Sequence, residues 1–300
     1  MNWKTHNMNW KIAFLLAMTL ILLTSGCIGP HPEDTDRSTY DGEDRIIVAV
    51  SIPPQAEFVE QIAGNRVRTI VMIPPGASPA THEPTPGQLK DVAYASMYAI
   101  VGSGLPFEEV WLTKIRAVNQ DMLIVDSSEG ITLRMMGEGT DPHIWTSPQN
   151  AKVMVENIYQ GLVRIDPDNQ GTYYTNKEEY LDKLDKADTD IRNALSGKEG
   201  SSFMVFHPSW GYFADEYELN MIPIEIEGKE PSAHQLSQII DTAKQNNITI
   251  IFVQTQFSSQ SAEAIAQEID GTVVPIDPLA ENYVENIGIV NGAFVQGLAE

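Results

Sequence analysis

Cysteine is almost absent from this sequence, since Cys27 is the single one among 300 residues. One cysteine excludes an internal disulfide and a zinc site built from several thiolates. Lysine and arginine are also scarce, 19 against 41 aspartates and glutamates, and the formal net charge is −22. Phosphate contacts need those cations, so we expect no binding of nucleic acid. An acidic surface attracts cations, although an ordinary solvated surface explains the charge as well.

A hydrophobic run long enough to cross a membrane is missing too. The most apolar stretch, residues 12–23, spans twelve residues, whereas a membrane span needs roughly 20. It follows Lys4 and Lys11 and precedes Cys27, the order of charge, apolar core and small-residue boundary that a cleaved leader has. We therefore expect a signal peptide over residues 1–26 and a lipid at Cys27, which would anchor the protein to the outer face of the cytoplasmic membrane. A chance thiol in a cleaved leader is the alternative.

The rest of the chain alternates strands with helices after a predicted flexible tether over residues 28–44, which is acidic and has no apolar period. Continuous apolar, β-branched runs are typical of parallel strands buried on both faces, and their alternation with helices predicts an α/β fold. We expect strands at residues 45–51, 66–73, 97–101, 122–125, 202–206, 221–226, 249–253 and 272–276. We expect helices at residues 54–63, 86–95, 105–119, 148–165, 173–195, 232–245, 261–269 and 283–298, and a short one ending near residue 217.

The long charged helix predicted at residues 173–195 separates two groups of strands. Its narrow apolar stripe favours a spine that joins two lobes. We expect an N-terminal lobe over residues 45–146, connecting helices over residues 147–199 and a C-terminal lobe over residues 200–300. Each lobe would hold a mainly parallel sheet flanked by helices, with the ligand in the cleft between the lobes. We expect the protein to be a monomer.

Four side chains lie beside prolines and follow predicted strands: His82, His143, His207 and Asp277. Ligands of open parallel sheets bind beyond the carboxyl ends of the strands, so these side chains fall on the functional edges, two from each lobe. Three imidazoles and one carboxylate suit a divalent transition metal, zinc above all. The alternative for each histidine is an ordinary buried or surface residue, because no His-x-x-x-His spacing supports the set.

Longer motifs surround these residues. They are Glu83-Pro-Thr-Pro86, Asp141-Pro-His-Ile-Trp145, His207-Pro-Ser-Trp-Gly-Tyr-Phe-Ala214, Glu227-Gly-Lys-Glu-Pro-Ser232 and Ile276-Asp-Pro-Leu279. Together they resemble the metal-binding solute receptors of zinc and manganese ABC importers, over residues 46–298. The resemblance implies two lobes joined by a rigid long helix, a metal ion between the lobes and delivery of that ion to a membrane permease.

By this resemblance, His143, His207 and Asp277 lie at the family's ligand positions. The first histidine departs from the pattern, because this chain has Ala80 where the family usually has histidine, and His82 follows two residues later. We expect His82 to take that role. Manganese receptors tend to carry glutamate where this chain has His207, which favours zinc. A manganese-specific receptor of the same type is the first alternative.

Two alternatives belong to other classes of protein. Four protein ligands leave no position for a catalytic water, so we expect no enzymatic activity. A zinc-dependent hydrolase would need an open position and a general base, for which Glu83 is the only adjacent candidate. A surface adhesion protein that keeps the metal for structure would unfold when the metal is removed, whereas an importer receptor would stay folded.

Overall fold

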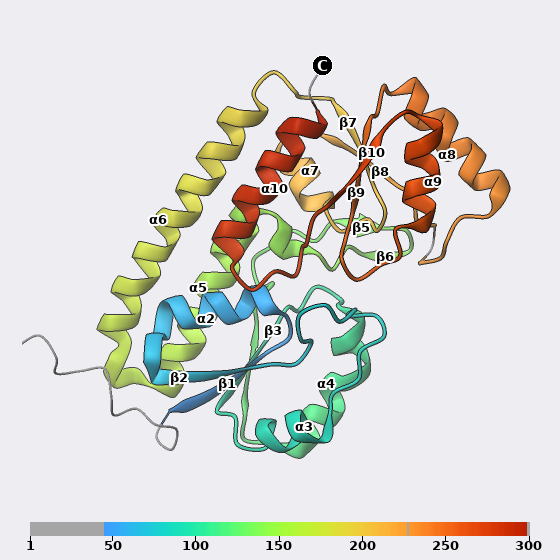
Figure 1. Cartoon of the computed structure of the whole chain (residues 1–300). Helices are drawn as coiled ribbons and strands as arrows, with labels where there is room; N and C mark the ends of the chain where they lie inside the picture. Colours follow the sequence, from blue (N-terminus) through green and yellow to red (C-terminus); the bar gives the residue numbers. More distant parts are fainter. Residues whose placement is uncertain (1–44, 227, 299–300) are drawn as a thin grey trace, which may run out of the picture. The chain divides into compact units, whose positions relative to one another are not determined.

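A computed structural model describes residues 45–226 and 228–298 of the chain. The predicted signal peptide, the predicted lipid attachment at Cys27 and the predicted tether lie outside these ranges. Within them, no helix joins the length and the apolar character that crossing a membrane demands. The chain from Arg45 onward forms one compact unit, whose elements Figure 1 labels.

The first four strands form one parallel sheet. They are β1 (Ile46–Val50), β2 (Val67–Val71), β3 (Met97–Ile100) and β4 (Leu123–Asp126). The strand order is β2–β1–β3–β4, and Val48 of β1 pairs with Thr69 on one side and Met97 on the other. The two central strands, β1 and β3, are continuously apolar, as strands covered on both faces should be.

Helices flank this sheet. They are α2 (Pro53–Ala63), which runs into the short turn η1 (Gly64–Arg66), α3 (Pro86–Val92) and α4 (Pro106–Val118). Each helix begins with proline, whose missing N–H has no partner to lose at the first helical position. Thr85 caps α3 as expected, since its hydroxyl accepts a hydrogen bond from the Gln88 backbone N–H at 3.2 Å.

The last four strands form a second parallel sheet with the order β10–β9–β7–β8. They are β7 (Ser202–Val205), β8 (Asn220–Pro223), β9 (Ile250–Val253) and β10 (Thr272–Pro275). The helices of this lobe are α7 (Gly211–Glu216), α8 (Ala233–Gln245), α9 (Gln260–Glu268) and α10 (Tyr283–Gly297). Alternate residues of β7 face opposite sides: Phe203 packs with Phe294 of α10, and Met204 packs with Ile265 of α9.

Two helices connect the sheets: α5 (Pro148–Ile165) and, after the turn η3 (Pro167–Asn169), α6 (Gln170–Leu195). With 26 residues, α6 is about 39 Å long at about 1.5 Å per residue. It packs against α5, against α2 of the first lobe and against α10 of the second, and Figure 1 shows it running along both lobes. The predicted fold class, two parallel α/β lobes joined by a spine helix, is confirmed.

One segment differs from the prediction. No strand or helix was predicted in residues 126–139, but they include β5 (Met135–Met136), which pairs with β6 (Gly139–Thr140) in a small antiparallel hairpin. Gly137 sits in its turn with φ of 62°, a conformation that glycine adopts without strain. The hairpin leads directly into the segment that carries His143.

Candidate metal centre

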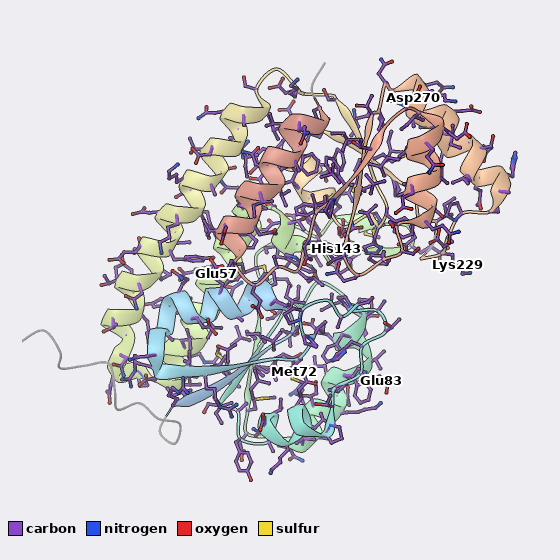
Figure 2. All side chains as sticks on the ribbon, viewed as in Figure 1. Glu57, Met72, Glu83, His143, Lys229 and Asp270 are labelled. Atoms are coloured by element: carbon purple, nitrogen blue, oxygen red, sulfur yellow. The ribbon has the colours of Figure 1, made fainter. Side chains whose placement is uncertain are left out.

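His143 lies on a segment that is anchored on several sides. A short turn, η2 (Ile144–Thr146), follows it and ends where Ser147 caps α5. The Ser103 hydroxyl donates to the Pro142 carbonyl at 2.6 Å, and the Trp145 indole N–H donates to the Pro278 carbonyl of the other lobe at 2.7 Å. These contacts fix the backbone on both sides of His143. Figure 2 shows His143 between the two sheets.

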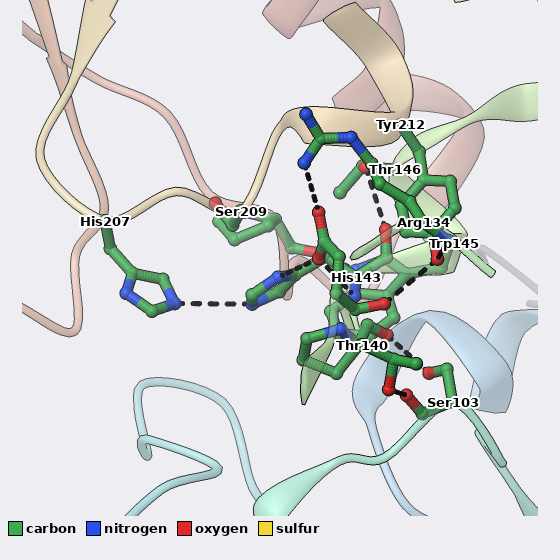
Figure 3. Close-up of polar contacts among 12 residues, drawn as sticks. Ser103, Arg134, Thr140, His143, Trp145, Thr146, His207, Ser209 and Tyr212 are labelled. Carbon is green, nitrogen blue, oxygen red and sulfur yellow. Dashed lines mark hydrogen bonds and ion pairs between the residues drawn. The ribbon is translucent and has the colours of Figure 1, made fainter. Parts of the chain in front are cut away.

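Asp141 orients the ring of His143. Its Oδ1 lies 2.8 Å from His143 Nδ1 and accepts the His143 backbone N–H at 3.0 Å, while Arg134 Nη1 lies 3.0 Å from Oδ2 (Figure 3). Burial alone would raise the pKa of Asp141, but the hydrogen bonds from His143 and Arg134 outweigh it and hold that pKa below its usual value. The ionised carboxylate therefore keeps the imidazole proton on Nδ1 and leaves Nε2 free.

Burial also acts on His143 itself. It lowers the pKa of His143 below the usual value, and the neighbouring Asp141 offsets this effect only in part. The imidazole is consequently neutral near pH 7, which is the form that binds metal ions.

Gly211 explains how Arg134 and Asp141 approach α7 so closely. A Cβ atom at this position would lie 2.3 Å from Arg134 Nη1 and 2.6 Å from Asp141 Oδ2, closer than atoms can pack. The Tyr212 hydroxyl, one residue further, donates to the Asp141 carbonyl at 3.0 Å. The second lobe thus supports the first lobe's histidine segment.

His207 follows β7 and is held by three neighbours. Hydrogen bonds continue the pairing of β7 and β8 past the end of the strands, with the Glu225 N–H donating to the Phe206 carbonyl at 2.9 Å. This pairing places Glu225 Oε2 2.8 Å from His207 Nδ1. The Gln254 side chain bonds both backbone groups of His207, and Phe257 stacks on the ring at 4.7 Å between centroids.

The two imidazoles face each other. Because each Nδ1 is bonded to a carboxylate, each Nε2 points at the other, and the two Nε2 atoms are 3.3 Å apart (Figure 3). Two lone pairs at this distance repel unless a proton or a cation lies between them. A tetrahedral zinc ion with Zn–N bonds of about 2.0–2.1 Å separates two ligand nitrogens by about 3.3–3.4 Å. The spacing therefore matches two nitrogen ligands of one zinc ion, each with the carboxylate partner that such ligands usually have.

The other two predicted ligands lie apart from this pair. Asp277 Oδ1 accepts hydrogen bonds from the Leu279 backbone N–H at 2.8 Å and from the Gln256 amide at 3.0 Å. The His82 ring stacks on Phe107, with 6.0 Å between the ring centroids. The buried Nε2 of His82 has no hydrogen-bond partner in the described part of the chain. Within residues 45–226 and 228–298, no group of three histidine, cysteine, aspartate or glutamate side chains is placed to hold a metal. The structure brings His143 and His207 together, and His82 and Asp277 stay predictions.

A cavity of about 370 Å³ opens beside the two imidazoles. Its wall comes from both lobes. Ala80 and Thr81 contribute from the segment between β2 and α3, the hairpin contributes Met136, and the second lobe contributes Phe257 and Leu279. The histidine pair is therefore accessible to a small solute from the space between the lobes.

Sequence reasoning missed the two residues that support the imidazoles from a distance in the chain. Glu225 had a detectable signal, because it is the one charged residue in the apolar run of residues 221–226. Arg134 had none, since nothing in the glycine-rich stretch around it indicates a buried partner.

Known proteins resemble this chain over most of its length. It matches the family described as "Zinc-uptake complex component A periplasmic" over residues 48–289. It is 29% identical over 279 residues to the high-affinity zinc uptake system protein ZnuA of Bacillus subtilis (strain 168), covering 87% of this chain and 85% of that protein. It is 29% identical over 307 residues to the manganese-binding lipoprotein MntA of Halalkalibacterium halodurans, covering 97% and 99%. A crystal structure of ZnuA superposes with a TM-score of 0.82 at 43% identity, covering 85% of this chain and 100% of that one.

Proposed function

The chain belongs to the family of periplasmic zinc-uptake components, and on that premise we propose that it is an extracytoplasmic receptor that binds one divalent transition-metal ion, zinc above all, and delivers it to the permease of an ABC importer. Members of this family are components of a transport complex and not enzymes. The hydrolase alternative gains no support from Glu83, which is exposed on the first lobe.

One observation carries the proposal: the 3.3 Å approach of two imidazole Nε2 atoms from opposite lobes. A metal ion bound there would be held by both lobes at once. Imidazole nitrogens suit zinc better than manganese, which prefers oxygen ligands. A zinc-uptake protein and a manganese-binding lipoprotein both stand among the relatives, so a manganese receptor of the same type is the second candidate.

The coordination shell would be completed by Asp277 and His82, as the sequence predicts. Asp277 would have to exchange its hydrogen bond with Gln256 for the metal, and His82 would have to leave its stacking on Phe107. If they are ligands, His82→Ala and Asp277→Ala each weaken zinc binding by at least tenfold. Unchanged zinc affinity in either variant removes that residue from the shell.

The proposed location of the receptor rests on the predicted signal peptide. We propose that Cys27 carries a lipid and that the monomeric receptor is held at the outer face of the cytoplasmic membrane, where the permease is reached. The relative from Halalkalibacterium halodurans is named a lipoprotein. Cys27→Ser would then release the protein from membranes in cell fractionation, and retention of the variant in the membrane fraction would contradict the anchor.

The central test is a competition titration of the metal-stripped full chain with zinc and with manganese. We expect one zinc ion per chain and weaker binding of manganese. Circular dichroism of the metal-stripped protein should show a folded chain, which separates a receptor from an adhesion protein that depends on metal for its structure. Binding of neither ion would contradict the proposed function.

A further inference from the structure

The loop between β10 and α10 passes through the core of the first lobe. Ile276, directly after β10, and Ile287, in α10, pack in the hydrophobic cluster of the second lobe. Between them, Leu279 and Tyr283 pack in the hydrophobic cluster of the first lobe, and they are 4% and 3% exposed. We call residues 277–283 the crossing segment. Its first residue is a predicted metal ligand, so the path of this segment bears on the site.

Polar contacts fix the far end of the crossing segment to the first lobe. The Tyr283 hydroxyl donates to the Trp145 carbonyl at 2.8 Å, and the Tyr283 backbone N–H donates to Glu57 of α2. The ring of Phe58, also in α2, packs edge-on against Tyr283 with 5.1 Å between the centroids. A shift of the segment against the first lobe would leave these buried polar groups without partners, which is costly.

One peptide group connects this anchoring to the Asp277 carboxylate. The Leu279 N–H donates to Asp277 Oδ1 at 2.8 Å. The carbonyl of the same peptide group belongs to Pro278 and accepts the Trp145 indole N–H at 2.7 Å. Trp145 therefore holds the peptide group whose other end orients the carboxylate.

Trp145 also packs against the first lobe's own predicted ligand. Its ring lies 5.4 Å from the His143 ring, measured between centroids. Pro278 and Leu279, which it holds, line the cavity beside the two imidazoles. The neighbours that hold His207 belong to the second lobe, and among the described residues no hydrogen bond or ring contact joins His207 to Trp145. One side chain thus touches the supports of two predicted ligands and not those of the third.

We propose that Trp145 is a positioning residue of the metal site, which holds Asp277 in a fixed place relative to His143, with Tyr283 keeping Trp145 in position. His143 and Asp277 then form a half-site that exists before the ion arrives. Asp277 has only to exchange its bond with Gln256 for the metal, because its backbone is already in place. This inference rests on the proposed function, in which Asp277 is a ligand, and specifies how the site is assembled.

A double-mutant cycle on the full chain tests whether Trp145 acts through Asp277. Trp145→Phe removes the indole N–H and should lower the affinity for zinc by about tenfold, as loss of a ligand's supporting partner does. In the Asp277→Ala background the same substitution should change affinity by about twofold or less, whereas in His207→Ala it should still cost about tenfold. An equal loss in the wild-type and Asp277→Ala backgrounds would overturn the inference.

A second variant keeps the test decisive if Trp145→Phe folds poorly. Tyr283→Phe removes a single hydroxyl and should lower zinc affinity by about threefold to fivefold, again with little effect in Asp277→Ala. The matched control is Tyr173→Phe, which removes another buried tyrosine hydroxyl, one that donates to Asp166 near the start of α6. This control should leave zinc affinity unchanged, and a loss in Tyr283→Phe no larger than in Tyr173→Phe would contradict the proposal.

Hydrogen exchange of the Trp145 indole proton tests whether the half-site precedes the ion. The signal that disappears in Trp145→Phe identifies this proton in the NMR spectrum. It should exchange slowly in the metal-stripped and in the zinc-loaded protein, and fast exchange in the metal-stripped form would overturn the inference. Zinc binding that Asp277→Ala leaves unchanged would also overturn it while the receptor function stands. Absence of zinc binding by the wild type would instead overturn the proposed function.

Discussion

His143 and His207 face one another at the same site, but the molecule holds them differently. The His143 side chain is 9% exposed and rests on the fully buried Asp141, which Arg134 supports in turn. The His207 side chain is 23% exposed, and one carboxylate and the stacked Phe257 hold it. The first lobe thus supplies a rigid ligand and the second a more adaptable one. We infer that His143 defines where the metal sits and that His207 closes on it.

The largest effect is expected from removing the ligands themselves. Four-ligand structural zinc sites contribute about 10–16 kcal/mol. One ligand of four is then worth about 3 kcal/mol, or about a hundredfold in affinity. His143→Ala and His207→Ala should each lower the affinity for zinc by about this factor, and the loss should be larger in His143→Ala. Competition titration against a chromophoric chelator measures both affinities. Wild-type zinc affinity in His207→Ala would contradict the role of His207 as a ligand.

The carboxylates behind the two rings should have the next largest effect. Loss of such a partner typically costs about 10–100-fold in metal affinity. Asp141→Asn should lie near the upper end of this range and Glu225→Gln near the lower, because Asp141 is the more buried and is also tied to Arg134. The control is Asp215→Asn, which removes an exposed partner of Arg134 and should change affinity by about threefold or less. A larger loss in Glu225→Gln than in Asp141→Asn would reverse the assignment of rigid and adaptable sides.

The pH response of His143 tests how Asp141 and burial act on this ring, which is the more buried of the two histidines. Burial holds the pKa of His143 below the usual value of about 6.5. For a histidine whose pKa is lower in the folded protein, folding favours the neutral ring. Its contribution to stability is present above about pH 6.5 and is lost as pH falls through the folded pKa. NMR titration of the metal-free protein should show the depressed pKa, and Asp141→Asn should lower it further because the carboxylate stabilises the protonated ring. An unchanged or raised pKa in that variant would contradict the role given to Asp141.

The smallest effect on metal affinity is expected from substitution of Glu216, where α7 of the second lobe contacts the segment after His143. The Ser147 hydroxyl donates to Glu216, and burial raises the pKa of Glu216 to about 7. For a carboxyl group with a raised folded pKa, the stabilising contribution is complete below its unfolded pKa of about 4.3 and disappears as pH rises through about 7. Glu216→Gln should therefore be more stable than the wild type at pH 8, by about 1–3 kcal/mol, with a smaller difference at pH 5.

Denaturant melts at both pH values measure this effect, and zinc titration of the same variant serves as the control. Zinc affinity should stay within about threefold, because Glu216 touches Ser147 and not His143. A large loss of zinc affinity would mean that the position of His143 depends on this contact between the lobes.

The two histidines also differ in how far their surroundings could be predicted from the sequence. Asp141 stands two residues before His143, so the two side chains are neighbours in the sequence itself. Glu225 is 18 residues from His207, and only the pairing of β7 with the segment after β8 brings them together. A local motif can be recognised in a sequence, whereas a partner brought in by sheet register cannot be assigned before the sheet is known.

The strands and helices themselves were predicted closely, because each combines an apolar period with clear end signals such as the Thr85 cap and the prolines that begin α2, α3 and α4. The hairpin of β5 and β6 was missed, since two-residue strands carry no periodic pattern. The predicted family is confirmed by the match over residues 48–289. The choice of His82 over Ala80 could not be decided from spacing, because a side chain's direction in a proline-rich segment depends on packing such as that of His82 on Phe107.

X-ray absorption spectroscopy at the zinc edge of the zinc-loaded full chain tests the central claim most directly. The account predicts three imidazole ligands with Zn–N distances of about 2.0–2.1 Å, from His143, His207 and His82, with one imidazole fewer in His143→Ala and one fewer in His207→Ala. A zinc shell without imidazole scattering, or one that neither substitution changes, would contradict the claim that the two lobes bind the ion through this histidine pair.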